Sequence, residues 1–575
     1  MATAWYGGAV GEDFLNPGPL TLIHPLLQRL GIAGIIDRHL PPDPQLEFSH
    51  GQVLSLLLAA RLCQPTALIN VPAWAKDTGA EWLWDIPADK LNDDRIGRSL
   101  DAFFEQRHSI SASVTSKVLQ WAELSLKRLH FDTTHLIFYG VYASSTARPA
   151  DSPQTLRGDA ELPPAHITHG YLSDAKMLQV GHTAIVDELG AVPIACHVLD
   201  GNRNGFTAIK EQVDLLCQHL PLPNETLLIS DRGTFSADHV ARMRRHGHHV
   251  LCSVPWNDYR ALYDAHQSSL SWRQASFLSR EQQRRRSSGS ALPHEYYELA
   301  VQRHSLTDPT TRESIPCRVI FVHSSADAAQ CRERRRQNIA KIQAGFAELA
   351  AKLQRGHPCT TAESIQRQIT RLLGRRDAAR FFHWDLLPLT AEEHAALPAP
   401  RQGFRRPTHR LTFTFDADAA EADARYDGLS ALVTTTPLSI SADVLFTQFK
   451  EQNYIERDHH QWKTPLAVRP VFLKSPRRVE ALVCLLHMAL QAHQLLERLY
   501  RQSLPTDAPS AEQRRTAESL LRDFRVCSIR LDRTPIGPIV FVPRTTPRQR
   551  QILQRLGLPS PAQTWARALP PVPTG

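Results

Sequence analysis

The sequence lacks the short motifs that mark several large enzyme classes. No G-x-x-x-x-G-K-[S/T], G-x-G-x-x-G or G-x-S-x-G pattern occurs in its 575 residues. The first pattern cradles phosphates in P-loop NTPases, the second binds dinucleotides, and the third holds the serine of α/β-hydrolases. The sequence therefore gives no basis for any of these three activities.

Long apolar runs are absent as well. The most apolar segments, Val53 to Leu62 and Val479 to Leu490, are interrupted by charged or polar residues, and a bilayer needs about 20 apolar residues. The N-terminus has no basic segment followed by an apolar one. Because 42% of residues are hydrophobic, 22% are charged and the mean hydropathy is -0.31, we expect an ordinary soluble protein without a membrane span or secretory signal.

Cysteine is sparse and histidine is abundant, but neither forms a metal-binding pattern. The nine cysteines are scattered without a C-x-x-C pair, which disfavours a disulfide framework or zinc ribbon and favours a reducing cytosol. Among 27 histidines, His166-x-x-His169 and the adjacent pair His459 and His460 lack the partners of a zinc site. We interpret most histidines as core or surface residues.

Positive charge is concentrated in one segment. The chain carries 66 basic and 58 acidic residues, a net charge of +8, and its isoelectric point is about 9.0. Between Cys331 and Arg376 there are 11 basic and three acidic residues, so this segment alone carries +8. Such a field favours a polyanion partner such as nucleic acid, although a solvated helix face explains many similar runs.

The periodicity of apolar residues changes near residue 128. Residues 20–127 have helical spacing, with Ser49 and Asn92 as expected N-caps and Ser109 or Ser111 opening the last helix. From Leu129 the pattern predicts strands and helices in the order β, β, β, α, β, α, β. The fold class is therefore α+β or α/β.

We divide the chain into five parts. These are a helical domain at 1–127, the first part of a mixed-sheet core at 128–256, an inserted basic α+β domain at 257–440, a helical completion of the core at 441–505, and a C-terminal segment at 506–575. The part at 441–505 is expected to begin with one helix that runs from Ser441 or Asp443 to Lys463. The end from Pro559 is Pro-rich, and we expect it to be disordered.

Three acidic residues suggest a metal site. Asp132 lies inside an apolar strand, where an acid needs a partner or a metal, and Asp231 follows a buried strand just before Gly233. The third, Glu456, shares a helix face with Lys463, seven residues on. Two of these acids have a plainer explanation: Asp231 could be a helix cap, and Glu456 could lie on a solvated helix face. If the first and fourth strands are neighbours, Asp132 and Asp231 converge.

The order of these elements resembles the DDE transposases of bacterial insertion sequences, in the long-form members of the "insertion sequence four" superfamily. The resemblance covers residues 15 to 560 and is carried by the runs LNDDRIGRSLDAFFE, HFDTTHLIFYG, HITHGYLSDAKMLQVGHTAIVDELGAVPIACHVLDGNRNG, LLISDRGTFS, DGLSALVTTTP and YIERDHHQWKTPLAVRPVFLKSPRRVEALVCLLHMAL. It implies a ribonuclease-H-like mixed sheet flanked by helices, with the insertion between the second and third acids.

The resemblance also implies a mechanism. Asp132, Asp231 and Glu456 would bind two Mg²⁺ ions, which Mn²⁺ can replace, for cleavage of DNA at element ends and strand transfer. The implied partners are double-stranded DNA, both terminal inverted repeats and target DNA, and a second copy of the chain. The implied setting is the bacterial cytoplasm at the nucleoid, with no membrane.

DNA contacts are expected from basic residues near the third acid and from the helical leader. The expected phosphate ligands are Lys450, Lys463, Arg469, Lys474, Arg477 and Arg478, and the leader at residues 20–127 is expected to recognise the element ends. The family pattern Y-x2-R-x3-E-x6-K is kept at Glu456 and Lys463 but replaced by Phe449 and Gln452; Lys450, Arg457 or Arg469 are the candidates to substitute. Trp256, Trp272 and Trp384 are candidates for stacking on a flipped base.

Two other functions compete with this interpretation. The two replaced signature residues are compatible with a domesticated or inactive copy that binds DNA without cutting it. A ribonuclease-H-like nuclease without transposition is the third hypothesis.

Overall fold

The protein is described from a computed structural model. The described residues are 11–138, 163–170, 176–187, 189–203, 205–289, 295–355, 361–400, 402, 404–463, 473–534, 537–542 and 544–568.

The N-terminal part is helical, as its periodicity predicts. Ser49 and Gln52 form a reciprocal capping box at the start of α3, and Asn92 caps α6. The last helix starts earlier than expected, at Arg107 after Gln106, and no side chain caps it. The helices are α1 (Leu20–Leu30), α2 (Ile32–His39), α3 (His50–Cys63), α4 (Val71–Thr78), α5 (Ala80–Trp84), α6 (Asp93–Glu105) and α7 (Arg107–Trp121), with short 3-10 turns at Leu68–Asn70 and Ala88–Lys90.

The long helix α19 (Pro476–Gln502) runs through this helical part and against the central sheet. It is long and apolar enough to cross a membrane, and the bent pair of His50–Cys63 with Leu68–Thr78 passes the same test as a unit. The apolar window of α19 is wholly buried inside the protein. Its hydropathy is thus accounted for by packing in the core, where its side chains join those of α3, α6 and α7.

The C-terminal residues return to the N-terminal helices. Strand β1 (Gly11–Leu15) pairs with β14 (Ile529–Thr534), which pairs with β15 (Gly537–Phe541), all antiparallel. Disorder from Pro559 is a wrong expectation for Pro561–Ala568, which form α23 and bury Trp565 in the N-terminal core. The remaining helices here are α20 (Ser510–Gln513), α21 (Ala517–Arg522) and α22 (Pro547–Leu556).

A ten-stranded mixed sheet forms the centre of the molecule. Its first half has the order β5-β4-β2-β6-β7, in which β5, β4 and β2 are antiparallel and β2, β6 and β7 are parallel. The two-residue β3 (Thr168–His169) flanks β4. These strands are β2 (Arg128–Phe138), β4 (Lys176–Asp187), β5 (Gly190–Asp200), β6 (Leu227–Ser230) and β7 (His249–Val254), linked by helices α9 (Gly205–His219) and α10 (Ala237–Arg245) and the 3-10 turn Arg232–Thr234.

Strands from the expected insertion continue this same sheet. β13 (Leu429–Thr434) pairs with β7, and β10 (Ser314–Ser324), β9 (Tyr297–Thr307) and β8 (Arg273–Gln274) follow it outward. The 257–440 segment is therefore divided: its two ends build the sheet edge, and its middle projects away. The other domain boundaries that we predict from the sequence remain predictions.

The projecting part, which we call the arm, comprises residues 325–424. It contains α13 (Ser325–Gln354), α14 (Ala362–Leu373), the 3-10 turn Asp377–Phe381, β11 (Phe382–Pro388), α15 (Ala391–Ala396), β12 (His409–Phe415) and α16 (Ala417–Ala424). The arm has its own hydrophobic core, built around Ile342, Phe346 and Ile369. Helices α11 (Trp256–His266), α12 (Arg280–Ser287), α17 (Ala442–Lys450) and α18 (Asn453–Lys463) complete the fold.

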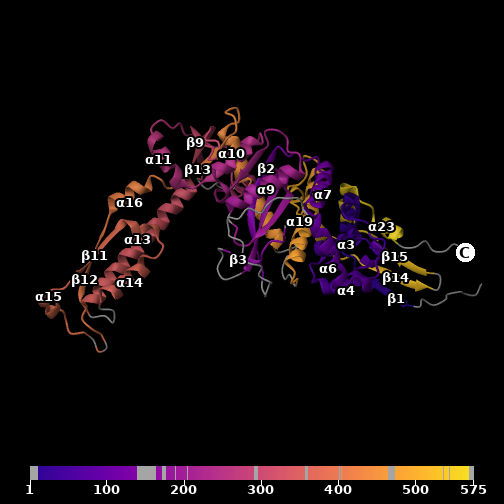
Figure 1. The fold of residues 1–575 in the computed structure, drawn as a ribbon, viewed down its shortest axis with the longest axis horizontal. Coiled ribbons are helices and arrows are strands. Elements are labelled where there is room, and N and C mark those ends of the chain that lie inside the picture. The colour runs from indigo at the N-terminus through magenta and orange to yellow at the C-terminus, as the bar shows by residue number, and fades with distance from the viewer. Residues whose placement is uncertain are drawn as a thin grey trace, which may run out of the picture.

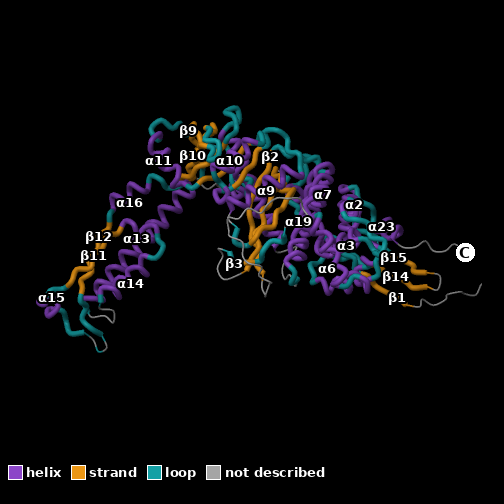
Figure 2. Tube along the Cα trace, in the orientation of Figure 1, coloured by secondary structure: helices purple, strands orange, loops and turns teal. Residues whose placement is uncertain are grey.

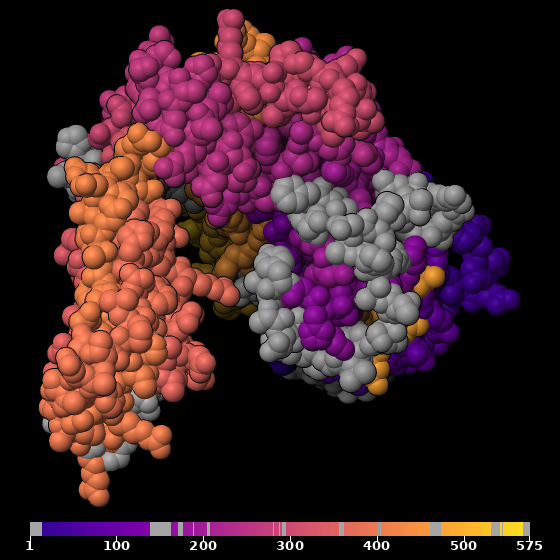
Figure 3. Space-filling model, turned by 60° about the vertical axis from the view of Figure 1, so that its left-hand side comes forward, coloured from indigo at the N-terminus to yellow at the C-terminus, as the bar shows by residue number. Residues whose placement is uncertain are grey.

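The molecule is elongated, with the arm at one end and β1, β14, β15 and α23 at the other (Figure 1). The central sheet lies between them, and helices dominate both flanking parts (Figure 2). The space-filling view shows an open hollow between the arm and the rest of the molecule (Figure 3). The arm and the rest of the molecule therefore border a concave side of the protein.

Candidate active site

Asp132 and Asp231 lie on adjacent segments of the chain, Asp132 within β2 and Asp231 directly after β6. The parallel register of β2 and β6 ends with Phe131 opposite Ser230, and the two aspartates are the next residues along the chain. Neighbouring strands are about 4.8 Å apart, and residues in register point to the same face. The condition that the first and fourth predicted strands be neighbours is thus met.

Local hydrogen bonds hold both carboxylates. The Thr133 backbone N–H donates to Asp132 Oδ1 at 2.7 Å, and the Gly233 N–H donates to Asp231 Oδ1 at 2.9 Å. Asp231 also caps the short turn that follows β6, so its helix-cap explanation holds as well. Asp231 is exposed and Asp132 is half-buried, so both are placed to receive a ligand at this edge.

Glu456 lies on α18, and this helix is tied to β2 on both sides of the glutamate. Gln452 donates to the Phe131 carbonyl at 3.0 Å and its Oε1 lies 2.9 Å from His130 Nδ1. His459 Nδ1 lies 3.6 Å from Asp132 Oδ2.

Gln452 and His459 are four residues before and three residues after Glu456, so all three share a helix face. The Glu456 N–H bonds to the Gln452 carbonyl at 3.5 Å, which keeps the turn helical although the predicted single helix is broken into α17 and α18. Both flanking residues contact β2 at or beside Asp132, and Glu456, which shares their helix face, is itself exposed.

Carboxylate oxygens are the ligands that Mg²⁺ prefers, so the donor chemistry of these residues fits that ion. Among the described residues, no group of three or more His, Cys, Asp and Glu side chains is already gathered closely enough to hold a metal. The fold therefore brings Asp132 and Asp231 together and places Glu456 on the neighbouring helix α18. The three carboxylates are not yet close enough to bind one metal ion together.

Sequence reasoning missed the buried polar residues behind these acids. His182 is opposite Asp132 in the register of β2 and β4, and its Nε2 is 3.8 Å from Asp458 Oδ2. Gln494 of α19 donates to Asp458 Oδ1 at 2.7 Å. Burial raises the pKa of Asp458, and the His182 hydrogen bond opposes this. The adjacent His459 and His460, interpreted from the sequence as core or surface residues, are the only signal for this cluster in the sequence.

Several expected DNA ligands have partners within the fold. Arg478 contacts both carboxylate oxygens of Asp101 at 2.7–3.1 Å, and Arg477 pairs with Glu105, so both fasten α19 to α6.

Lys450 Nζ lies 4.6 Å from the centre of the Tyr297 ring, and burial lowers the pKa of Lys450. Lys474 is exposed, so a DNA contact there stays a prediction. Arg469 and the side chain of Lys463 lie outside the described residues.

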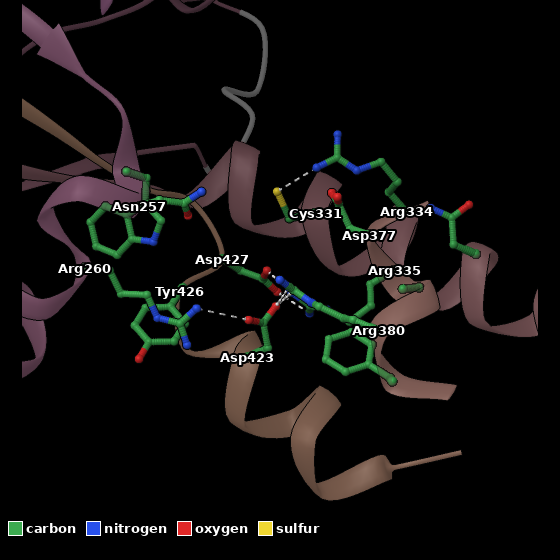
Figure 4. Close-up of a pocket in the computed structure, with 14 residues that line it drawn as sticks. Asn257, Arg260, Cys331, Arg334, Arg335, Asp377, Arg380, Asp423, Tyr426 and Asp427 are labelled. Atoms are coloured by element: carbon green, nitrogen blue, oxygen red, sulfur yellow. Dashed lines mark hydrogen bonds and ion pairs between the residues drawn. The ribbon is translucent and has the colours of Figure 1, made fainter. Parts of the chain in front are cut away.

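The three tryptophan candidates have different surroundings. Trp384 packs in the arm core, and Trp272 lies edge-on to His323. Trp256 lines a cavity of about 190 Å³ at the base of the arm (Figure 4). There Asp423 faces three arginines, Arg380 at 2.5 Å, Arg335 at 3.7 Å and Arg260 at 3.8 Å. The Arg260 pair joins the arm to α11, and the other two pairs lie within the arm.

Comparison with known proteins gives limited matches. A family model described as "Domain of unknown function (DUF4277)" matches residues 17–112, which span α1 to α6 and the start of α7. No curated protein matches the chain. A solved structure titled "Cryo-EM structure of piggyBac transposase synaptic complex with hairpin DNA (SNHP)" is similar with a TM-score of 0.34 and 9% identity, over 97% of this chain and 87% of that chain. Similarity of this extent does not establish a shared fold.

Proposed function

We propose that the protein is a DDE transposase of the "insertion sequence four" type, which cleaves DNA at the ends of its element and joins them to target DNA. The observation that supports this most directly is the placement of Asp132 within β2 and Asp231 directly after the adjacent parallel strand β6, with the helix of Glu456 held against β2 by Gln452 and His459. The strand order β5-β4-β2-β6-β7 supports a ribonuclease-H-like core, since the first and fourth strands are neighbours.

In this proposal the three carboxylates hold two Mg²⁺ ions, and Lys463 holds a DNA phosphate. When bound, the metal would activate the attacking water or 3′-hydroxyl and stabilise the leaving oxygen. The chain's own residues orient the carboxylates: the Thr133 and Gly233 N–H groups each bind the Oδ1 oxygen of Asp132 and Asp231.

The arm is the best candidate for DNA backbone contact. Exposed basic side chains of α13, α14 and the turns that follow them include Arg332, Arg334, Lys341, Arg355, Arg367, Arg371 and Arg375. Residues 1–127 instead contain 14 acidic and 10 basic residues, a net charge of -4. Phosphate attraction therefore favours the arm, and any recognition of element ends by the helical leader must rely on base contacts more than on charge.

Cleavage of a linear duplex that carries the element's own terminal repeats tests the proposal. We expect Mg²⁺-dependent nicking and a joined strand-transfer product. Asp231→Asn should abolish cutting and keep DNA binding, because it removes a metal ligand and retains a side chain that can cap the turn. Asp507→Asn, an exposed substitution outside both the arm and residues 1–127, is the matched control and should cut normally.

Each alternative outcome has a meaning. DNA binding without cutting by the wild type would favour the domesticated DNA-binding protein, and cutting without joined product would favour a nuclease. Equal loss of binding and cutting in Asp231→Asn would mean that Asp231 is a structural cap. Inverted repeats flanking the gene would independently support a mobile element.

A further inference from the structure

His459 connects the third acid's helix to the first acid's carboxylate. Its Nδ1 lies 3.6 Å from Asp132 Oδ2, the oxygen not bound by the Thr133 N–H. The His459 side chain is only about one-tenth exposed. We infer that His459 is a positioning residue that orients Asp132 for metal binding; this rests on the proposed function.

The imidazole of His459 is itself held in place by buried neighbours. The His182 ring meets it edge-on, with ring centres 5.3 Å apart and planes at 69°, and the His487 ring meets His182 in the same way at 5.7 Å. His182 is fully buried beside Asp458, which Gln494 holds from α19. A ring packed in this way has little freedom to rotate, so it can fix the direction of the carboxylate that it faces.

Gln452 and His459 both connect α18 to β2. Gln452 fastens the start of α18 to His130 and to the Phe131 carbonyl, one residue before Asp132. His459 fastens the same helix to Asp132 itself, two turns further along. Two polar contacts therefore set the distance between the strand of Asp132 and the helix of Glu456, and only the one from His459 acts on a proposed metal ligand directly.

Two substitutions of similar polarity separate positioning from packing. His459→Asn keeps an amide N–H at the place of Nδ1, whereas His459→Gln moves it to the place of Nε2, away from Asp132. The measurement is Mn²⁺ binding by the full chain without DNA, followed by electron paramagnetic resonance, together with the thermal unfolding midpoint. Substitution of residues that orient metal ligands commonly costs 10- to 100-fold in metal affinity.

We expect His459→Gln to weaken Mn²⁺ binding by about 10-fold or more and His459→Asn to stay near the wild type, with matching unfolding midpoints. Equal affinities in both variants, or equal losses in both, would overturn the positioning role. Asp132→Asn tests the proposed metal site separately from the role of His459. If this substitution leaves Mn²⁺ binding of the otherwise wild-type chain unchanged, the proposed metal site is wrong, regardless of the results for the His459 variants.

Discussion

At the scale of single residues, Arg107 and Glu480 form a buried ion pair. The Arg107 Nε donates to Glu480 Oε1 at 2.7 Å, with both side chains about 2–3% exposed. The other carboxylate oxygen of Glu480 accepts from the Ala165 N–H at 2.7 Å, and Arg107 also donates to the Phe104 carbonyl. The pair therefore joins α7, α19 and the segment that leads into β3. Removal of either partner would leave the other charge buried without a counter-ion.

Glu480→Gln tests this dependence. The substitution keeps the shape and leaves the Arg107 charge buried without a counter-ion, so we expect a loss of about 3–5 kcal/mol in unfolding free energy. Urea denaturation followed by circular dichroism measures it. Lys90→Ala, which removes an exposed pair with Glu47, is the control and should cost at most about 1 kcal/mol. Similar small losses in both variants would contradict the coupling.

At the scale of elements, the C-terminal helix α23 belongs to the N-terminal core. The Trp565 side chain is 1% exposed, and a Cβ built on Gly79 would lie 2.6 Å from its ring and 2.8 Å from Leu15. Gly79 also has a φ of +72°, which favours glycine. The tight turn between α4 and α5 therefore makes room for the indole ring.

Trp565→Ala should remove this packing. Deleting a buried tryptophan typically costs about 3–5 kcal/mol because a cavity remains. We expect the thermal midpoint of the helical part to fall, measured by differential scanning calorimetry. Val526→Ala, at a side chain that is 93% exposed, should leave the midpoint unchanged. An unchanged midpoint in Trp565→Ala would mean that α23 does not dock in solution.

At the scale of the whole molecule, buried histidines link stability to pH. Burial lowers the pKa of His130 and His197 to about 3, and that of His24, His239 and His493 to about 4. The unfolded chain binds protons at these residues near pH 6.5, and the folded chain does not. Stability is therefore fully present above pH 6.5 and falls as pH drops from 6.5 towards 4.

The thermal midpoint should accordingly be lower at pH 5.5 than at pH 7.5. Each such histidine contributes up to about 1.4 kcal/mol per pH unit within the window. His239→Phe removes one of these groups at a buried position and should reduce the pH dependence of the midpoint. Midpoints that are equal at both pH values, in the wild type, would show that these histidines are accessible to protons in the folded state.

Much of the local structure follows from the sequence. The N-terminal helices lie within residues 20–127, where the periodicity predicts them, and the caps at Ser49 and Asn92 form as expected. Apolar spacing and capping residues act over a few positions, so the sequence contains that information directly. The same local rules placed Asp132 in a strand, Asp231 after one, and Glu456 on a helix face.

Long-range choices were decided only by the tertiary structure. Nothing local indicates that β8, β9, β10 and β13 extend the central sheet, because strand pairing depends on residues far apart in the chain. Arg477 and Arg478 have the composition of a DNA surface, yet carboxylates of α6 lie against them. The contact of His459 with Asp132 likewise joins residues more than 300 positions apart. The sequence by itself determined which acids could form a site, and the packing of α18 on β2 decided how they are held.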